Sequence, residues 1–553
     1  MRVNDNSPAT PVPGVGIYRQ VVDGALGRAL SRLDWEPTSA SRGSFDRTWW
    51  GWKFTDFSAA RFQEGLFTLA WLLTSPAAPP RARSNERLLE GAVAAIHFWR
   101  KLQHRDGSFD EAYPFERSLA ATAFTGFYVG SGLERLRSQL TPNAADAGLQ
   151  AIERGADWLA RNGEYHGVLS NHLAAAAAAL HVAGDLLATD RFKAARDRYL
   201  GIIYANQDPE EGWLREYGGA DPGYQSHAMF YLAEIWRRGG DAELFERLGR
   251  ATRFIAWFAH PDGTLGGEYA SRGTKFAYPA AFEMLARDVP AAAGVAAHLR
   301  RCMAQGRGVG PHQMDAWNIF PVLNNYLFAC DAAGDLSAAP RLPWQDHAGW
   351  NIFERAGLAV GCAGGRLLVS GLSLGGACKL WDASRGALIY EDCGYALVGP
   401  QARLSSQSAS SWTVEKDING ELRFRLMAPF TPVPSLRFGP WRFLAFRAFT
   451  LTIGRLPVVA RGLKGLLVRL LIRRKAPHAA RLERCIAFDA QGRLRIEDEV
   501  RGLERPAVAV DRQVPFHMGS ARYADFPDWL GAEIRCPEPQ YQPPGRLWRI
   551  VEL

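Results

Sequence analysis

The sequence predicts two folded parts, an incomplete (α/α) toroid followed by an antiparallel β-sandwich. Three observations carry this prediction. Residues 46–335 show helical periodicity almost throughout. Within this region, glycine-centred turns recur about once per helical hairpin. Beyond residue 345, short segments of alternating polar and apolar residues replace the helical pattern. The chain has 553 residues, which is too many for a single core, so several domains are expected.

These patterns place the domain boundaries. Residues 1–45 are polar and rich in Pro, Ser and Gly, with one short helical stretch from Tyr18 to Leu33, and are expected to form an N-terminal extension. Residues 46–340 are expected to form the toroid. Residues 341–553 are expected to form the sandwich, which carries a basic amphipathic insertion near 436–476.

The glycine turns define an internal repeat. Gly107, Gly163, Gly212 and Gly263 follow helical segments at separations of 56, 49 and 51 residues, and an apolar residue follows each turn. That period matches one helical hairpin per repeat and predicts that the four loops lie on the same rim. Hairpins side by side close into a toroid with these loops around a central cleft, although an open solenoid has the same period.

The predicted sandwich begins with segments such as GLAVGC, RLLVSGL and GALIYEDCGYALVG and continues with ELRFRLMAP and CIAFDAQGRLRIEDEV. Period-two alternation with Gly and Asp turns is typical of antiparallel strands. In the last segment we expect a hairpin turn at Ala490–Gly492.

One segment of the insertion, residues 458–475, has the pattern of a basic amphipathic helix. Its cations are Arg461, Lys464, Arg469, Arg473, Arg474 and Lys475, and its apolar side holds Leu463, Leu466, Leu467, Leu470 and Leu471. Such a helix can lie in a membrane interface and would give the protein a peripheral membrane contact. It can equally pack on the toroid with a solvated basic edge.

Composition narrows the function classes. The net charge is +8, which favours acidic glycans, anionic lipid or nucleic acid, and because no nucleic-acid module is recognisable we expect no nucleic-acid partner. The seven cysteines form no CxxC pair, which argues against a disulfide framework and a structural zinc site. A P-loop, a dinucleotide fingerprint and a Gly-x-Ser-x-Gly elbow are all missing. We therefore expect neither a metal nor a cofactor.

The N-terminal sequence has no apolar core of signal-peptide length, and no apolar run reaches transmembrane length. This predicts a cytoplasmic protein that can associate with a membrane, or a periplasmic one if the start codon is misassigned.

The candidate site lies on the rims of successive predicted helices. Asn171 and His172 open an alanine-rich helix, and Tyr224 follows 53 residues after Asn171, about one helical hairpin later. An amide and an imidazole can neutralise a sugar carboxylate by hydrogen bonding, which acidifies the adjacent carbon, and a phenol can remove the proton. Arg272 is expected on the same rim, where its charge would help the tyrosine to ionise at neutral pH.

A toroid followed by a sandwich, with Asn-His on one helix and a Gly-Tyr segment one hairpin later, resembles the heparinase II/III-like polysaccharide lyases and the related alginate lyases. The segments GALIYEDCGYALV and RLRIEDEVRG resemble strands of that family's sandwich, and VDRQVPFHMGS resembles its late strand ending in His. The resemblance covers most of residues 46–530.

The resemblance implies a carbon–oxygen lyase that cleaves an acidic, uronate-containing polysaccharide by β-elimination. It assigns Asn171 or His172 to neutralising the carboxylate, Tyr224 to acid–base work and Arg272 to supplying positive charge. Residues near these positions are expected to bind the substrate: Trp213, Glu216, Tyr217, His227, Tyr231, Glu268 and Tyr269.

The sequence departs from the family at the start of the sandwich, where a His-x-His-x-Asp-like stretch usually faces the cleft. The comparable region, LGGACKLWDASRGALIYEDCGY, retains Asp382 and Asp392 and contains no histidine. His517 lies further along, where nothing in the sequence places it at the cleft. A second base or metal ligand from the sandwich is therefore missing.

Each candidate also has a structural interpretation. Asn171 can cap its helix together with Ser170, His172 can make a structural hydrogen bond, and Glu268 can pair with Arg272 in a loop. Tyr224 and Tyr231 can be packing aromatics, and His227 can pack or hydrogen-bond.

Two other functions remain open. A glycoside hydrolase on the same toroid needs two carboxylates across the cleft, for which the rim offers Asp110, Glu111, Glu211, Glu216, Asp221 and Glu268. A glycan-binding or assembly protein at the membrane surface would use the basic helix, with Trp49, Trp50 and Trp52 stacking on sugar rings.

Overall fold

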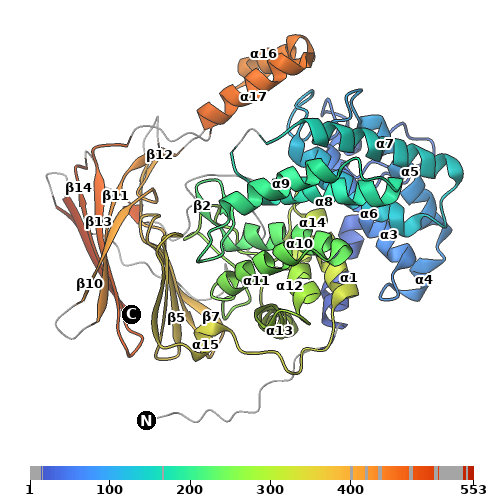
Figure 1. Cartoon of the computed structure of the whole chain (residues 1–553). Coiled ribbons are helices and arrows are strands. Elements are labelled where there is room, and N and C mark those ends of the chain that lie inside the picture. The colour runs from blue at the N-terminus through green and yellow to red at the C-terminus, as the bar shows by residue number, and fades with distance from the viewer. Residues whose placement is uncertain are drawn as a thin grey trace.

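The computed structural model describes residues 14, 16–164, 167–398, 403–416, 421–433, 439–471, 477–503, 508–509, 540–542 and 546–553. A helical domain and a layered β domain lie side by side, and a pair of helices, α16 and α17, projects from the β domain (Figure 1). The helical toroid and the antiparallel sheets predicted from the sequence are both present.

The helical domain is built from paired helices. Their bounds are α1 (Gly16–Leu30), α2 (Arg47–Trp52), α3 (Gly65–Thr74), α4 (Pro80–Arg83), α5 (Glu86–Leu102), α6 (Leu119–Leu136), α7 (Pro142–Arg161), α8 (Ser170–Leu187), α9 (Lys193–Asn206), α10 (Pro222–Gly239), α11 (Ala242–Ile255), α12 (Ala280–Leu285), α13 (Pro290–Ala304), α14 (Ile319–Ala332) and α15 (Pro343–Asp346). Short 3₁₀ turns lie at η1 (Ala60–Glu64) and η2 (Pro311–Gln313).

In the described part of the chain, six helices form an inner ring in the order α3, α6, α8, α10, α12 and α14. The sequence predicts an incomplete toroid, whereas α14 packs against α3 and closes this ring. Phe67 of α3 stacks on Phe328 of α14 at 4.3 Å, and the Thr68 hydroxyl donates to the Asn324 side chain at 2.8 Å. Helices α5, α7, α9, α11, α13 and α1 each cover one inner helix from outside.

Helix α1 moves the predicted boundary of the toroid. It packs against α14 and α13, and its buried Tyr18 donates a hydrogen bond of 2.6 Å to Glu283 of α12. The described residues from Gly16 onward therefore belong to the helical domain rather than to a separate extension ending at residue 45. Apolar periodicity in a short stretch could not show this, because the partner of α1 lies almost 300 residues later in the chain.

The glycine turns all connect an outer helix to the next inner helix, so they share one rim, at the N-terminal ends of the inner helices. Gly107, Gly212 and Gly263 have φ values of +99°, +83° and +81°, in the left-handed region that favours glycine. A Cβ at Gly107 would lie 2.1 Å from the Arg154 carbonyl oxygen. In the second loop along the chain, the left-handed residue is Gly167 rather than Gly163.

The described residues of the β domain form three antiparallel sheets. The five-stranded sheet consists of β3 (Gly349–Phe353), β4 (Leu358–Ala363), β5 (Arg366–Gly371), β6 (Ala377–Asp382) and β7 (Ala387–Asp392). The six-stranded sheet is ordered β10 (Ser411–Lys416), β11 (Leu422–Pro429), β13 (Arg481–Phe488), β14 (Leu494–Arg501), β17 (Arg546–Glu552) and β16 (Gln540–Gln542). A smaller sheet is ordered β12 (Thr431–Val433), β9 (Arg403–Ser405), β8 (Tyr395–Val398) and β15 (Val508–Ala509).

The five-stranded sheet is buried on both faces. Val360 and Val369 pack into the core of the helical domain, whereas Ala359 and Leu368 pack against the six-stranded sheet. This explains why β4 and β5 read as continuous apolar runs. Strands β13 and β14 alternate buried and more exposed residues, because only one of their faces is covered. They are joined by the predicted turn, in which Gly492 has a φ of +82°.

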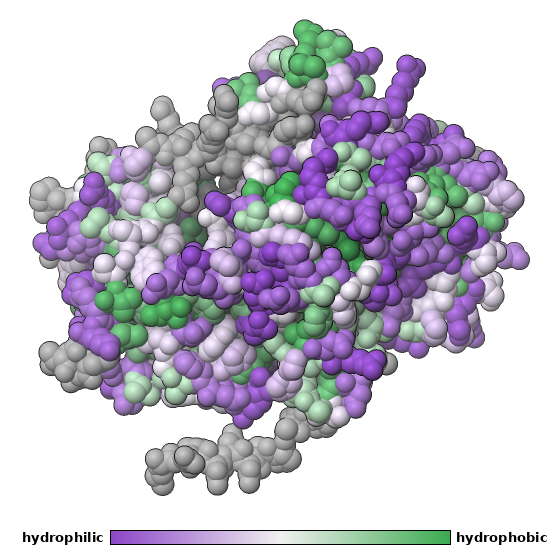
Figure 2. Space-filling view, in the orientation of Figure 1, coloured by the Kyte–Doolittle hydropathy of each residue, from purple (hydrophilic) through white to green (hydrophobic). Residues whose placement is uncertain are grey.

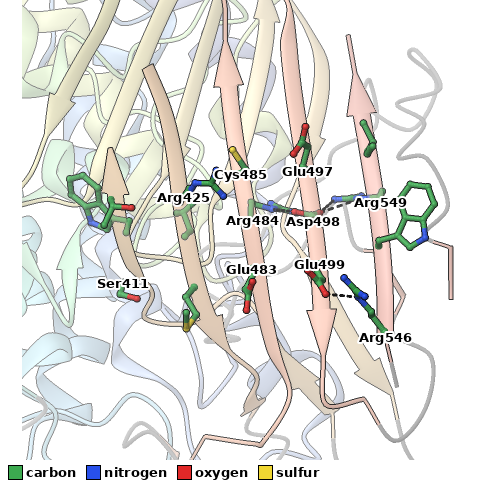
Figure 3. Close-up of a pocket in the computed structure, with 16 residues that line it drawn as sticks. Ser411, Arg425, Glu483, Arg484, Cys485, Glu497, Asp498, Glu499, Arg546 and Arg549 are labelled. Atoms are coloured by element: carbon green, nitrogen blue, oxygen red, sulfur yellow. Dashed lines mark hydrogen bonds and ion pairs between the residues drawn. The ribbon is translucent and has the colours of Figure 1, made fainter. Parts of the chain in front are cut away.

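A buried ion network spans the middle of the β domain. Arg484 of β13 and Arg549 of β17 lie on either side of Asp498 of β14 (Figure 3). The Arg484 Nε donates to Asp498 at 2.7 Å, and its Nη2 donates to Asp392 of β7 at 3.0 Å. The two guanidinium groups hold the pKa of Asp392 well below its usual range, although burial opposes this. The network therefore ties the two sheets together.

We expect Arg484→Met to lower the free energy of unfolding by about 3–5 kcal/mol, because it leaves two buried carboxylates facing one arginine. Arg495→Met is the matched control: Arg495 lies on the next strand, is half exposed, and pairs with Glu497 and Glu552. Its loss should cost no more than about 1 kcal/mol. Urea denaturation of both variants tests the difference, and equal costs would show that the buried network is not a major source of stability.

Candidate active site

The candidate residues gather where α8 and α10 begin. A two-stranded hairpin of β1 (Arg215–Glu216) and β2 (Gly219–Ala220) holds this region together. The Ser170 hydroxyl donates to the Arg215 carbonyl at 2.7 Å, and the Ser271 hydroxyl donates to the Glu216 carbonyl at 3.0 Å. The hairpin thus connects the start of α8 to the loop before α12. The inner helices α8 and α10 both direct their positive N-terminal ends toward it.

Asn171 does not cap its helix. The residue in the N-cap position is Leu169, and the Asn171 Nδ2 instead donates to the Glu216 Oε1 at 2.7 Å. Both side chains are buried. Burial raises the pKa of Glu216 to about 7, although the Arg272 guanidinium and the Asn171 hydrogen bond favour its charged form. Near neutral pH this carboxyl therefore exists in both protonation states.

Tyr224 and Arg272 meet because both are held by Asp221. Its carboxylate accepts from the backbone N–H of Tyr224 at 2.9 Å and from that of Arg272 at 2.8 Å. The Arg272 Nη2 then lies 3.5 Å from the Tyr224 hydroxyl, and the guanidinium carbon lies 4.8 Å from the centre of that ring. A cation in this position stabilises the phenolate that forms when a tyrosine gives up its proton.

Tyr217 completes the arginine's surroundings. It lies in the turn of the β1–β2 hairpin with a φ of +57°, and the Arg272 guanidinium carbon is 4.5 Å from the centre of its ring. Burial raises the pKa of Tyr217 to about 12 even though Arg272 hydrogen-bonds to it. Tyr217 therefore stays protonated near neutral pH.

His172 lies next to Asn171 on the rim and retains some solvent exposure. Its Nδ1 is 2.7 Å from the Glu164 Oε2, and its ring packs edge-on against Phe124 of α6 at 5.5 Å. The acidic partner orients the imidazole, so that His172 can present a ring nitrogen to a ligand on the rim.

His227 and Tyr231 form the layer beneath. The His227 ring stacks between Tyr278 at 4.0 Å and Phe124 at 5.4 Å, and its Nε2 is 3.0 Å from the Tyr231 hydroxyl. Burial holds the pKa of His227 well below its usual value, so the ring is neutral. The sequence predicts that both residues bind substrate, and in the structure both are buried next to Phe124.

A second cation on the same rim, Arg61, is not among the residues predicted from the sequence. Arg61 lies in η1, just before the first inner helix, where it pairs with Glu64 and lies 3.1 Å from Glu111. Its guanidinium carbon is 4.3 Å from the centre of the Phe124 ring, so Arg61 and His172 flank the same aromatic side chain. The internal repeat could have predicted this position, because η1 precedes the inner helix α3 in the same way as the loop before Asn171 precedes the inner helix α8.

Three predicted substrate-binding residues are engaged in other contacts, two of them where the two domains meet. The Glu268 carboxylate lies 2.8 Å from the Lys275 Nζ and 2.6 Å from the Lys379 Nζ, so the expected pairing with Arg272 is wrong. The Tyr269 hydroxyl is 2.9 Å from the His260 Nε2 and is buried. The Trp213 indole donates to Glu211, whose carboxylate also accepts the backbone N–H of Arg355 and Ala356 from the β domain.

The carboxylates considered for hydrolysis are mostly committed to structure. Asp110 lies 2.8 Å from His104 and accepts the backbone N–H groups of Phe115 and Arg117. Asp221 is the buried N-cap of α10, and burial raises its pKa to about 6. Glu111, which pairs with Arg61, and Glu216 are the two that lie at the site.

Among the described residues, strand β6 brings a lysine to the toroid. Lys379 of β6 lies 2.5 Å from Glu391 of β7 as well as next to Glu268. Of the two aspartates that match the family pattern, Asp382 accepts the backbone N–H groups of Ser384 and Arg385, and Asp392 belongs to the buried network. Neither therefore reaches the site. His517 lies outside the described residues.

A shallow cavity of about 730 Å³ lies elsewhere, on the six-stranded sheet (Figure 3). Trp548, Glu499 and Arg546 are among the residues that line it, and none of the sequence-predicted site residues does. Its Glu499 is paired with Arg501 at 2.8 Å, and Arg546 lies against the same carboxylate. This cavity is therefore separate from the candidate residues on the toroid rim.

The raised pKa of Glu216 predicts how stability changes with pH. The folded protein retains this proton between pH 4.5, the ordinary value, and about 7, where the unfolded chain has released it. Stability from this group is therefore lost as the pH rises through that window. The free energy of unfolding of the wild type should therefore fall between pH 5 and pH 8. In Glu216→Gln we expect this fall to be smaller by on the order of 2 kcal/mol. Urea denaturation at both pH values measures it, and an unchanged loss would rule out a raised pKa.

Comparison with known proteins gives the fold a context. No protein-family model matches the sequence, and a search of curated proteins finds no match. Among solved structures, the chondroitin AC lyase of Streptomyces coelicolor A3 in complex with chondroitin sulphate superposes with a TM-score of 0.53 and 11% identity, over 91% of this chain and 68% of that one. Heparinase III gives 0.50 and 12%, over 91% and 74%.

A Paenibacillus xanthan lyase gives a TM-score of 0.52 and 9% identity over 89% of this chain, which spans only 46% of the xanthan lyase. At such low identity these similarities concern the fold. All three structures align with about nine tenths of this chain, which covers both the helical and the β domain. The chain therefore shares the fold of these three lyases, a helical toroid joined to antiparallel β-sheets.

Proposed function

We propose that this protein is a polysaccharide lyase that cleaves a uronate-containing polysaccharide by β-elimination. The observation that carries the proposal is the contact between the Tyr224 hydroxyl and the buried Arg272 guanidinium, at the rim where Asn171 also lies. A tyrosine needs such a cation to exchange protons at neutral pH. The fold shared with three polysaccharide lyases supports the same activity.

The first requirement of the reaction is to neutralise the uronate carboxylate, because its charge opposes loss of the neighbouring C5 proton. The positive N-terminal ends of α8 and α10 and the side chains of Asn171 and His172 provide donors for this purpose. Glu216 contributes when it is protonated. Its neutral carboxyl no longer offsets the positive charge of Arg272, so that this charge attracts the substrate carboxylate. Binding of an acidic sugar is therefore favoured below pH 7.

The second requirement is proton transfer. The Tyr224 phenolate, stabilised by Arg272, takes the C5 proton, and the electron pair of that C–H bond forms the C4–C5 double bond. The C4–O bond to the next sugar breaks at the same time, and the leaving oxygen takes up a proton from the Tyr224 hydroxyl. Charge on the substrate carboxylate grows during this step, and donors fixed in place before the reaction stabilise it most effectively.

Hydrolysis is less well supported. It requires one carboxylate as the acid and a second one placed to activate water or attack the sugar. Glu216 has a suitable pKa of about 7, but its oxygen accepts the Asn171 amide inside the rim. Glu111 is held by Arg61. Because a lyase product contains an unsaturated uronate that absorbs ultraviolet light, absorbance separates the two reactions directly.

We expect Tyr224→Phe to lower kcat by at least about 100-fold on a uronate polysaccharide, the usual contribution of a positioned acid–base group, while glycan binding is retained. Absorbance assays across a panel of uronate polysaccharides measure turnover, and calorimetry measures binding. Tyr199→Phe is the matched control, since it removes a buried tyrosine hydroxyl that donates to the Leu159 and Asn162 carbonyls at the end of α7.

Full turnover by the Tyr224→Phe variant would remove this tyrosine from the mechanism. New reducing ends without ultraviolet absorbance would identify a hydrolase instead. Binding of one glycan without turnover by the wild type would identify a glycan-binding protein on a lyase fold.

A further inference from the structure

A helical hairpin inserted in the β domain exposes an unusual amount of apolar surface. It consists of α16 (Pro440–Leu451), the turn η3 (Ile453–Arg455) and α17 (Pro457–Leu471). Its most exposed apolar side chains are Trp441 at 82%, Val458 at 73%, Leu456 at 58%, Leu444 and Ile453 at 56%, and Leu466 at 52%. Hydrophobic side chains gather on this projecting hairpin in Figure 2. A soluble monomer rarely leaves so contiguous a patch uncovered.

The hairpin is also exclusively cationic. Residues 440–471 contain six Arg and Lys residues and no Asp or Glu. Arg442 and Arg455 are exposed beside the apolar side chains. A segment that combines apolar side chains, a tryptophan and cations without any acidic residue has the chemistry of a helix that lies in the interface of an anionic bilayer.

The hairpin lies against the toroid on the rim that carries the site. Arg447 pairs with Asp56 at 3.1 Å, and Phe446 packs edge-on against Tyr113 at 5.1 Å. The Arg117 guanidinium donates to the Arg455 carbonyl at 2.7 Å. Tyr113 and Arg117 belong to the loop of Glu111, the partner of Arg61. The hairpin therefore bridges the β domain and the rim beside the candidate site.

The toroid extends the same apolar surface. Trp52 at the end of α2 is 82% exposed, and Phe54 in the following loop is 93% exposed. This loop leads directly into Asp56, which pairs with the hairpin. The α2 loop and the hairpin, almost 400 residues apart in the chain, thus both expose large apolar side chains next to the Asp56–Arg447 ion pair.

We propose that the hairpin is a membrane-interface anchor that binds anionic bilayers and holds the rim of the toroid at the lipid surface. A second copy of the chain is the less suitable occupant, because two hairpins of the same positive charge repel each other. Anionic lipid supplies the opposite charge and covers the apolar side chains. Among the described helices none is long and apolar enough to cross a bilayer.

The test is cosedimentation of the full chain with vesicles of phosphatidylglycerol and phosphatidylcholine, compared with vesicles of phosphatidylcholine alone. Leu444→Glu combined with Val458→Glu places two charges on the exposed hairpin. Ile202→Glu combined with Val414→Glu makes the same change in net charge at two other exposed apolar positions, each 38% exposed. The milder Trp441→Ala serves as a third variant, and thermal unfolding checks that each protein is folded.

We expect the wild type and the control to bind anionic vesicles, with weaker binding at high salt, and the hairpin variant to bind at least tenfold more weakly. Trp441→Ala should fall between them. Absence of wild-type binding, or equal binding by the hairpin variant and the control, would overturn the proposal. So would a dimer, detected by light scattering, that the hairpin variant abolishes, since this would make the patch a self-association surface.

This proposal is independent of the lyase activity. The hairpin variant changes no residue assigned to the chemistry, so its turnover of a soluble oligosaccharide should equal that of the wild type. Loss of vesicle binding with unchanged turnover would separate the anchor from the active site.

Discussion

The candidate site depends on one buried carboxylate, Asp221. It caps α10 and also accepts the backbone N–H of Arg272 from the loop before α12. Two oxygens of one side chain thereby fix the helix that carries Tyr224 and the loop that carries its cation. Desolvation of this carboxylate raises its pKa, and the two N–H groups offset part of that cost. Asp221 thus fixes the backbone positions from which the phenol and the guanidinium extend toward each other.

The sequence predicted which residues lie on this rim better than it predicted which residues they contact. The recurring glycine turns placed Asn171, Tyr224 and Arg272 on one rim, and the structure brings the three to the β1–β2 hairpin. Local sequence could not predict that Glu268 pairs with Lys379, because that lysine arrives on a strand of the other domain. It likewise could not show that Arg61 shares Phe124 with His172, since this requires helices from separate repeats to meet.

The fold was predictable to a similar degree. Periodicity distinguished the helical from the β region, but it could not show that α14 returns to α3 or that α1 covers α14. Ring closure depends on the small rotation between successive hairpins, which hydrophobic spacing does not encode. The continuous apolar runs in β4 and β5 did contain a signal: they differ from the alternating β13 and β14 because both of their faces are covered.

The doubly buried five-stranded sheet also determines how the molecule can move. Phe353 and Trp381 belong to the core of the helical domain, while Leu380 and Tyr390 of the same sheet belong to the core of the sandwich. A hinge between the domains would have to expose one of these apolar faces to water. Relative motion of the two domains is therefore costly, because it would separate apolar surfaces that are buried on both sides of one sheet.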